Sequence, residues 1–124
     1  MEGYPQNTYS VPTKRYCQTL SLRDDPELIA AYRRLHSQEG VWKEVLDGIR
    51  SVGILEMEIY LVGTRLVMIV EAPADFCWTA AMERLAKLPR QAEWEALTAS
   101  YQNAGANATS DEKWQMMERI FHLY

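Results

Sequence analysis

Tyr32 and His36 stand four residues apart in the segment YRRLHSQEGVW, whose first part is predicted to be helical. Residues at this spacing lie on one face of a helix, so the phenol and the imidazole can contact one ligand together. An imidazole with the ordinary histidine pKa of about 6.5 gains and loses a proton readily near neutral pH. The pair therefore suggests a site in which His36 carries a proton and Tyr32 positions a polar group.

The same two residues also have a purely structural interpretation. Tyr32 can be a core residue with its hydroxyl at the rim, and His36 can be an exposed residue that caps the last carbonyl groups of the helix. Spacing alone favours this interpretation, because isolated histidines are seldom catalytic. The second histidine, His122, lies among apolar residues of the last predicted strand, and we interpret it as structural.

Carboxylates interrupt three apolar segments, at Glu58, Glu71 and Glu118. A carboxylate in such a segment has to be paired, hydrogen-bonded or protonated. Pairing with Arg65 or Arg119 explains any one of them equally well. Carboxylates beside aromatic rings are also what a sugar site needs, because they accept hydrogen bonds from hydroxyl groups while a flat ring covers the C–H side of a pyranose.

Trp42 and Trp94 are the candidates for such a flat ring, and Glu58 is the carboxylate that we expect to contact the ligand. Core packing is the more common role of a tryptophan at helical spacing. The strong sequence signatures of nucleotide, serine-hydrolase and zinc sites are missing: no Gly-rich phosphate loop, no G-x-S-x-G, no His/Cys cluster and no H-E-x-x-H. We therefore expect a site with neither a metal nor a cofactor.

The elements that must position these residues follow one another as strand, helices, strand, strand, helices and strand. Strands are predicted over residues 15–22, 54–62, 65–71 and 113–124. Helices are predicted over residues 26–36, from 41 to a left-handed stop at Gly53, over 75–87, and around Trp94. Gly63 and Thr64 form the turn of a hairpin, and residues 102–110 form a loop by composition.

This order predicts an α+β fold of the ferredoxin-like, split βαβ type, an antiparallel sheet with its helices on one face. The closing strand is apolar on both sides, which indicates that both faces of the sheet are covered. Because helices cover one face only, we expect the other to meet the sheet of a second subunit, giving a homodimer described as a dimeric α/β barrel.

The length of 124 residues favours a single domain over residues 13–124, after a flexible arm over residues 1–12 that carries two prolines and a glycine. The net charge of -4, without a basic cluster, argues against nucleic acid as a partner. The apolar runs are too short to cross a membrane, and no signal segment opens the chain. We therefore expect a cytoplasmic protein whose two cysteines are free thiols.

Five segments, taken in order, resemble the L-rhamnose mutarotase family, including its L-fucose branch. They are RYCQTLSLRDDPELIAAYRRLH, GVW, GILEMEIYLVGTRLVMIVE, AEWE and KWQMMERIFHLY. The resemblance spans residues 14–124 and implies a ferredoxin-like domain that dimerises through its sheet. It also implies a sugar mutarotase, an isomerase that interconverts the α and β anomers of a 6-deoxy-L-hexose without a metal or redox cofactor.

The resemblance implies a role for four residues of the predicted site. It makes His36 the proton donor, Tyr32 a substrate-binding residue and Trp94 a contact to the sugar, and it matches Trp42 to the family tryptophan that follows the histidine. The family commonly spaces that histidine and tryptophan four residues apart, with a proline next. Here the spacing is six and Lys43 follows.

Two further departures from the family bear on the substrate. Rhamnose-type members have a binding tyrosine where this chain has Met57, and a second tryptophan where it has Glu95. These differences favour L-fucose over L-rhamnose. Other functions stay open, because ferredoxin-like dimers also serve as small-molecule sensors, as cofactor-independent or haem-degrading monooxygenases, and as structural dimers.

Overall fold

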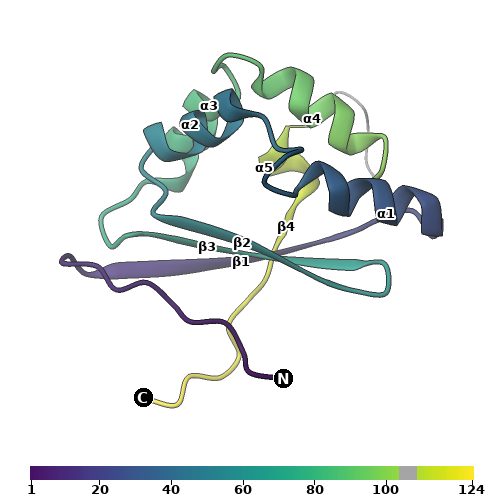
Figure 1. Cartoon of the computed structure of the whole chain (residues 1–124). Coiled ribbons are helices and arrows are strands. Elements are labelled where there is room, and N and C mark those ends of the chain that lie inside the picture. The colour runs from purple at the N-terminus through teal and green to yellow at the C-terminus, as the bar shows by residue number, and fades with distance from the viewer. Residues whose placement is uncertain (104–108) are drawn as a thin grey trace.

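A computed structural model of the chain describes residues 1–103 and 109–124 as one antiparallel sheet covered by helices on one face (Figure 1). The strands are β1 (Thr13–Ser21), β2 (Glu56–Val62), β3 (Arg65–Pro73) and β4 (Gln115–Met116). The helices are α1 (Pro26–Leu35), α2 (Lys43–Ser51), α3 (Trp78–Leu85), α4 (Gln91–Ala99) and α5 (Ser110–Lys113).

The sheet has the strand order β2-β3-β1-β4, so β1 and β3 are its two central strands. β1 pairs with β3 along its whole length, from Thr13 opposite Pro73 to Ser21 opposite Arg65. β2 and β3 form the predicted hairpin, and Gly63 takes a left-handed conformation (φ 58°) at its turn. The prediction of a split βαβ, ferredoxin-like α+β fold is confirmed.

The core lies between the sheet and the helices. Alternate residues of β3 point to the helices and are buried, namely Leu66, Met68, Val70 and Ala72. The first three pack in one cluster with buried side chains of α3. Because a strand turns successive side chains to opposite faces, this alternation fixes which face of the sheet carries the core.

α1 begins and ends where the sequence predicts. The Asp25 carboxylate accepts hydrogen bonds from the backbone N–H groups of Glu27 (2.9 Å) and Leu28 (3.4 Å), and Pro26 occupies the first helical position. The helix ends at His36, whose backbone N–H still donates to the carbonyl of Tyr32. These two ends determine where the predicted pair lies relative to the sheet.

The prediction of a long closing strand over residues 113–124 is wrong. Residues 110–113 form α5, which Thr109 and Glu112 cap reciprocally, and only Gln115–Met116 pair with β1. After the N–H of Met117 donates to the carbonyl of Cys17, the chain leaves the sheet. Alternating apolar residues indicate an extended chain, but they do not supply the partner strand that a β-ladder requires. Within the predicted 102–110 loop, residues 104–108 lie outside the described residues.

Both chain termini lie on the face of the sheet that carries no helix (Figure 1). Residues 1–12 form neither helix nor strand, and they run along this open face. The Tyr4 ring lies 5.7 Å from that of Tyr60, and the Asn7 carboxamide donates to the Glu56 carboxylate (3.1 Å). In the described part of the chain, no helix has the length and hydropathy needed to cross a lipid bilayer.

The Asp25 cap can be tested by substitution. We expect Asp25→Ala to lower the free energy of unfolding by about 1 kcal/mol, because two N–H groups at the start of α1 lose their acceptor. This corresponds to a fall in Tm of about 4 °C by differential scanning calorimetry. The neighbouring variant Asp24→Ala is the control and should change Tm by less than about 2 °C. Equal effects of the two substitutions would contradict the assigned cap.

Candidate active site

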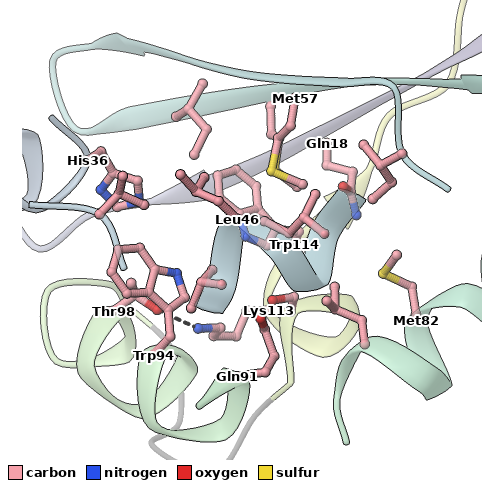
Figure 2. Close-up of a pocket in the computed structure, with 18 of the residues that line it drawn as sticks. Gln18, His36, Leu46, Met57, Met82, Gln91, Trp94, Thr98, Lys113 and Trp114 are labelled. Carbon is pink, nitrogen blue, oxygen red and sulfur yellow. Dashed lines mark hydrogen bonds between the residues drawn. The ribbon is translucent and has the colours of Figure 1, made fainter. Parts of the chain in front are cut away.

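A cavity of about 360 Å³ lies between the sheet and the helices, in the size range of small-molecule sites (Figure 2). One part of its wall is apolar and includes Leu46, Met57 and Met82. The rest carries polar and aromatic side chains, most of them from β1, the end of α1, α4, α5 and the segment after α4. Among these are Gln18, Tyr32, His36, Gln91, Trp94, Thr98, Gln102 and Lys113.

Three of the residues predicted from the sequence meet at this cavity. The rings of Tyr32 and His36 have centroids 4.2 Å apart, as their shared helix face predicts. The His36 ring also lies 5.4 Å from that of Trp94, in an edge-to-face arrangement. α1 and α4 thus bring the phenol, the imidazole and the indole to one wall of the cavity.

The end of α1 fixes the protonation of the imidazole. The Nδ1 atom of His36 lies 2.8 Å from the backbone carbonyl oxygen of Tyr32. A carbonyl oxygen only accepts hydrogen bonds, so Nδ1 carries the hydrogen and Nε2 is the nitrogen that exchanges protons. Burial lowers the pKa of His36, and the bond to the Tyr32 carbonyl offsets part of that shift. The ring is therefore neutral at pH 7, with a basic lone pair on Nε2.

The phenol of Tyr32 is almost fully buried and stays protonated. Its oxygen accepts a hydrogen bond from the Gln102 carboxamide at 3.3 Å. Burial raises the pKa of Tyr32 to about 12, and the hydrogen bond from Gln102 lowers it slightly. Across the neutral range, Tyr32 therefore keeps an O–H group that can donate to a ligand.

Trp42 supports the site from outside the cavity wall. Its ring packs edge-to-face against Trp94, with centroids 5.2 Å apart, and the Arg90 guanidinium lies 4.0 Å from the Trp42 ring centroid. Trp42 is not among the described residues that line the cavity. The six-residue spacing after His36 thus places this tryptophan where it orients Trp94.

Glu58 lies on the other side of the sheet. On β2, Met57 and Ile59 face the cavity, so the alternation of the strand turns Glu58 to the open face. There its carboxylate accepts a hydrogen bond from the Tyr60 hydroxyl (2.9 Å) and lines a hollow of about 50 Å³ beneath the N-terminal arm. Glu58 therefore does not line the cavity beside His36, and the expected contact between Glu58 and the ligand is not supported.

Three buried glutamines line the cavity, and the sequence analysis did not select them. Gln18, Gln91 and Gln102 are 1%, 3% and 1% exposed. Among the described residues, none donates a hydrogen bond to the Oε1 atom of any of the three. A buried acceptor without a donor costs about 1–3 kcal/mol, so these oxygens favour a ligand that brings its own O–H or N–H groups.

The sequence pattern could have identified one of these glutamines as a buried residue. Gln18 falls in phase with Tyr16, Leu20 and Leu22, which all point to the helices, so it is a polar residue at a core-facing strand position. Gln91 and Gln102 have no such signal. Gln91 is the first residue of α4 and Gln102 follows the helix, and only the packing of α4 against the rest of the fold turns them inward.

Glu95 does not line the cavity itself, but its side chain binds residues that do. Its carboxylate accepts hydrogen bonds from the Gln91 carboxamide (3.2 Å) and from the backbone and hydroxyl of Ser110 (3.0 and 2.7 Å). Both donors line the cavity, as Met57 does. Met57 and Glu95 are the two positions at which the resemblance implies a difference from rhamnose-type members. Within residues 1–103 and 109–124, no three His, Cys, Asp or Glu side chains gather as a metal site.

The comparison with family models matches residues 15–123 to the L-rhamnose mutarotase family. The chain belongs to this family. It is 41% identical to an L-fucose mutarotase of Xanthomonas campestris pv. campestris over 110 residues, 89% of this chain and 88% of that protein. It is also 36% identical to a UPF0734 protein of Dictyostelium discoideum over 114 residues, 89% of this chain and 90% of that protein.

A solved structure supports the fold. An L-rhamnose mutarotase from Formosa agariphila superposes with a TM-score of 0.63 at 18% sequence identity, covering 90% of this chain and 99% of its own. The predicted resemblance is thus confirmed, and with it the prediction of a carbohydrate isomerase.

The unpartnered oxygen of Gln18 predicts an effect on stability. We expect Gln18→Met to raise the free energy of unfolding of the ligand-free protein by about 1 kcal/mol, because a buried acceptor is removed with little change in shape. Chemical denaturation followed by tryptophan fluorescence measures this change. Gln102→Met is the matched control and should be destabilising, because it also removes the hydrogen bond to Tyr32. A Gln18→Met protein less stable than Gln102→Met would contradict the assignment.

Proposed function

We propose that this protein interconverts the α and β anomers of a 6-deoxy-L-hexose, with L-fucose favoured over L-rhamnose. The observation that carries the proposal is the cavity in which the half-buried, neutral imidazole of His36 shares a wall with Trp94 and with unpartnered glutamine oxygens. Such a site binds a molecule with one apolar face and several hydroxyl groups beside a proton carrier. Membership of the L-rhamnose mutarotase family supports the same reaction.

The reaction opens and recloses the pyranose ring. The anomeric hydroxyl loses its proton as the ring oxygen gains one, and the open aldehyde turns about the bond between its first two carbons before it recloses on the other face. In this proposal, Nε2 of His36 takes the proton from the anomeric hydroxyl and returns it on reclosure, so His36 is base and donor in turn. One positioned proton carrier typically contributes about 10²- to 10⁴-fold to the rate.

The remaining wall suits the sugar that we propose. Trp94 offers a flat face to the C–H side of the pyranose, and the Tyr32 hydroxyl donates to a sugar oxygen. The oxygens of Gln18, Gln91 and Gln102 accept from sugar hydroxyls. The methyl group of a 6-deoxy sugar needs an apolar neighbourhood, which the part of the wall around Met57 supplies.

Two observations favour L-fucose. The relative from Xanthomonas campestris, 41% identical to this chain, is an L-fucose mutarotase. Met57, where the resemblance implies a tyrosine in rhamnose-type members, lines the cavity, and Glu95, where it implies a tryptophan, binds residues that line it. L-Fucose and L-rhamnose differ in the orientation of ring hydroxyls. Different side chains in the cavity wall would therefore contact different hydroxyls and favour one of the two sugars.

The decisive experiment measures anomer exchange. Saturation-transfer NMR on L-fucose and on L-rhamnose should show faster exchange with the wild-type protein, and more so for L-fucose. His36→Ala should lose about 10²- to 10⁴-fold of the rate, whereas His122→Ala, at the exposed other histidine, should keep it. A fully active His36→Ala would contradict the role of the imidazole. Sugar binding without faster exchange would instead indicate a sugar-binding protein.

The pKa of His36 predicts the acidic side of the pH profile. Burial lowers this pKa below the ordinary 6.5. The neutral, proton-accepting ring therefore persists at pH 7 and is lost only as the pH falls below about 6.5. Exchange rates measured from pH 4.5 to 7.5 should rise with pH, and the pH of half-maximal rate should lie below 6.5. A half-maximal rate at or above pH 6.5 would contradict a depressed pKa.

We also propose that the chain forms a homodimer through the open face of its sheet. No described helix covers that face, and its central residues Cys17, Val67 and Ile69 are only half-buried. The tail beyond β4 adds exposed apolar side chains, among them Ile120 (93% exposed) and Phe121 (75%). Burying such surface against a second copy is a common solution for an uncovered sheet.

Light scattering after gel filtration tests the dimer. We expect a mass of twice the 14.3 kDa of one chain for the wild-type protein. Phe121→Asp should shift the mass towards that of one chain, because it brings a charge into the contact. Ala80→Asp places the same charge on an exposed position of α3 and should leave the dimer intact. A monomeric wild-type protein would contradict this proposal.

A further inference from the structure

Lys113 is a buried lysine in the wall of the cavity. It is the last residue of α5 and is 7% exposed, although lysine is among the residues that proteins bury least. Its side chain reaches between α5 and α4 and ends beside Trp94 and Thr98 (Figure 2). Desolvating an ammonium group is costly, so its position here calls for a functional explanation.

The amine makes two hydrogen bonds to described residues, which leave one of its N–H groups without an acceptor among them. Nζ donates to the backbone carbonyl of Glu95 and to the hydroxyl oxygen of Thr98, each at 2.9 Å. Among the described residues, no other oxygen accepts from this amine. The Glu95 carboxylate instead binds Gln91 and Ser110, so Lys113 is not locked in an ion pair. The third N–H can therefore turn to a ligand in the cavity.

The surroundings of the amine make its proton easy to give up. Burial lowers the pKa of Lys113 to about 8, and the charge of Glu95 offsets part of the shift. The other ionisable groups nearby are Asp111 and Glu112 on its own helix, and those that line the same cavity are Tyr32, His36, Arg50 and Glu56. At pH 7 the amine is still mostly protonated, which is the state that a proton donor needs.

Lys113 and His36 both lie next to Trp94. The His36 ring is 5.4 Å from the Trp94 ring, and the amine of Lys113 is bound to Glu95 and Thr98, one and four residues further along α4. In the view of Figure 2, the indole lies between the imidazole and the amine. A pyranose stacked on Trp94 would therefore have one proton carrier near each side.

We propose that Lys113 is the second proton carrier of the anomer exchange, a role that rests on the proposed function. As Nε2 of His36 takes the proton of the anomeric hydroxyl, the electrons of that O–H bond form the C=O bond of the aldehyde. The bond between the anomeric carbon and the ring oxygen breaks, and its electron pair takes a proton from the Lys113 ammonium. His36 ends as imidazolium and Lys113 as a neutral amine, and reclosure reverses both transfers.

The main test replaces Lys113 by methionine, which has a similar length and no proton to give. We expect Lys113→Met to lower the rate of L-fucose anomer exchange by about 10²- to 10⁴-fold. L-Fucose binding, followed by quenching of tryptophan fluorescence, should weaken no more than a few-fold. Lys87→Met, at an exposed lysine after α3, is the matched control and should be fully active.

The pH profile separates a proton carrier from a structural anchor. The wild-type rate should fall as the pH rises through about 8, and the residual activity of Lys113→Met should lack this fall. Thr98→Val keeps the amine but removes one acceptor that favours its charged form, so the fall should move to lower pH. The Thr98 variant tests the inference even if Lys113→Met does not fold.

Each remaining outcome has a distinct meaning. A Lys113→Met protein that exchanges L-fucose at the wild-type rate would overturn this inference and leave the proposed function intact. An unchanged alkaline limb in Lys113→Met and Thr98→Val would overturn it too, and would indicate that Lys113 only anchors α5. A wild-type protein that exchanges neither sugar would overturn the proposed function, and this inference with it.

Discussion

Desolvation of the side chains between the sheet and the helices is the constraint on which the chemistry of this protein depends. The same burial lowers the pKa of His36 and of Lys113, because both groups are charged when protonated. The ordinary pKa of histidine lies below 7 and that of lysine far above 7. After both pKa values are lowered, the pKa of His36 is still below 7 and that of Lys113, at about 8, is still above it. At pH 7 the cavity therefore holds one basic imidazole and one acidic ammonium, and no metal is needed to separate the two roles.

The hydrogen bond from Nδ1 of His36 to the backbone carbonyl of Tyr32 fixes the orientation of the imidazole. It ties the ring to the last turn of α1, selects the tautomer and leaves Nε2 for the ligand. The support itself depends on where α1 ends and on the packing of Trp94, which Trp42 and Arg90 hold in turn. The proposed exchange of protons at two oxygens of one sugar carbon requires such rigid positioning.

The cavity also explains the distribution of polar groups in the fold. β3 gives the core a purely apolar row, Leu66, Met68, Val70 and Ala72, whereas the neighbouring strand β1 places Gln18 in the equivalent row. Buried glutamines and a buried lysine weaken a core, and proteins keep such groups where binding or catalysis uses them. The apolar part of the core compensates for this loss, and it lies beside the cavity in one continuous layer.

The sequence by itself determined the elements whose signals are local: the caps of α1, the β2–β3 hairpin, the alternation of β3, and the shared face of Tyr32 and His36. Tertiary structure alone decided which side chains share the cavity. It joined Gln102 to Tyr32 across 70 residues, turned Glu58 to the far face, and made a helix end of Lys113, which the alternation had assigned to a strand. Periodicity reports which face of an element a residue occupies, but contacts between distant segments depend on how those faces pack, and no local pattern encodes that.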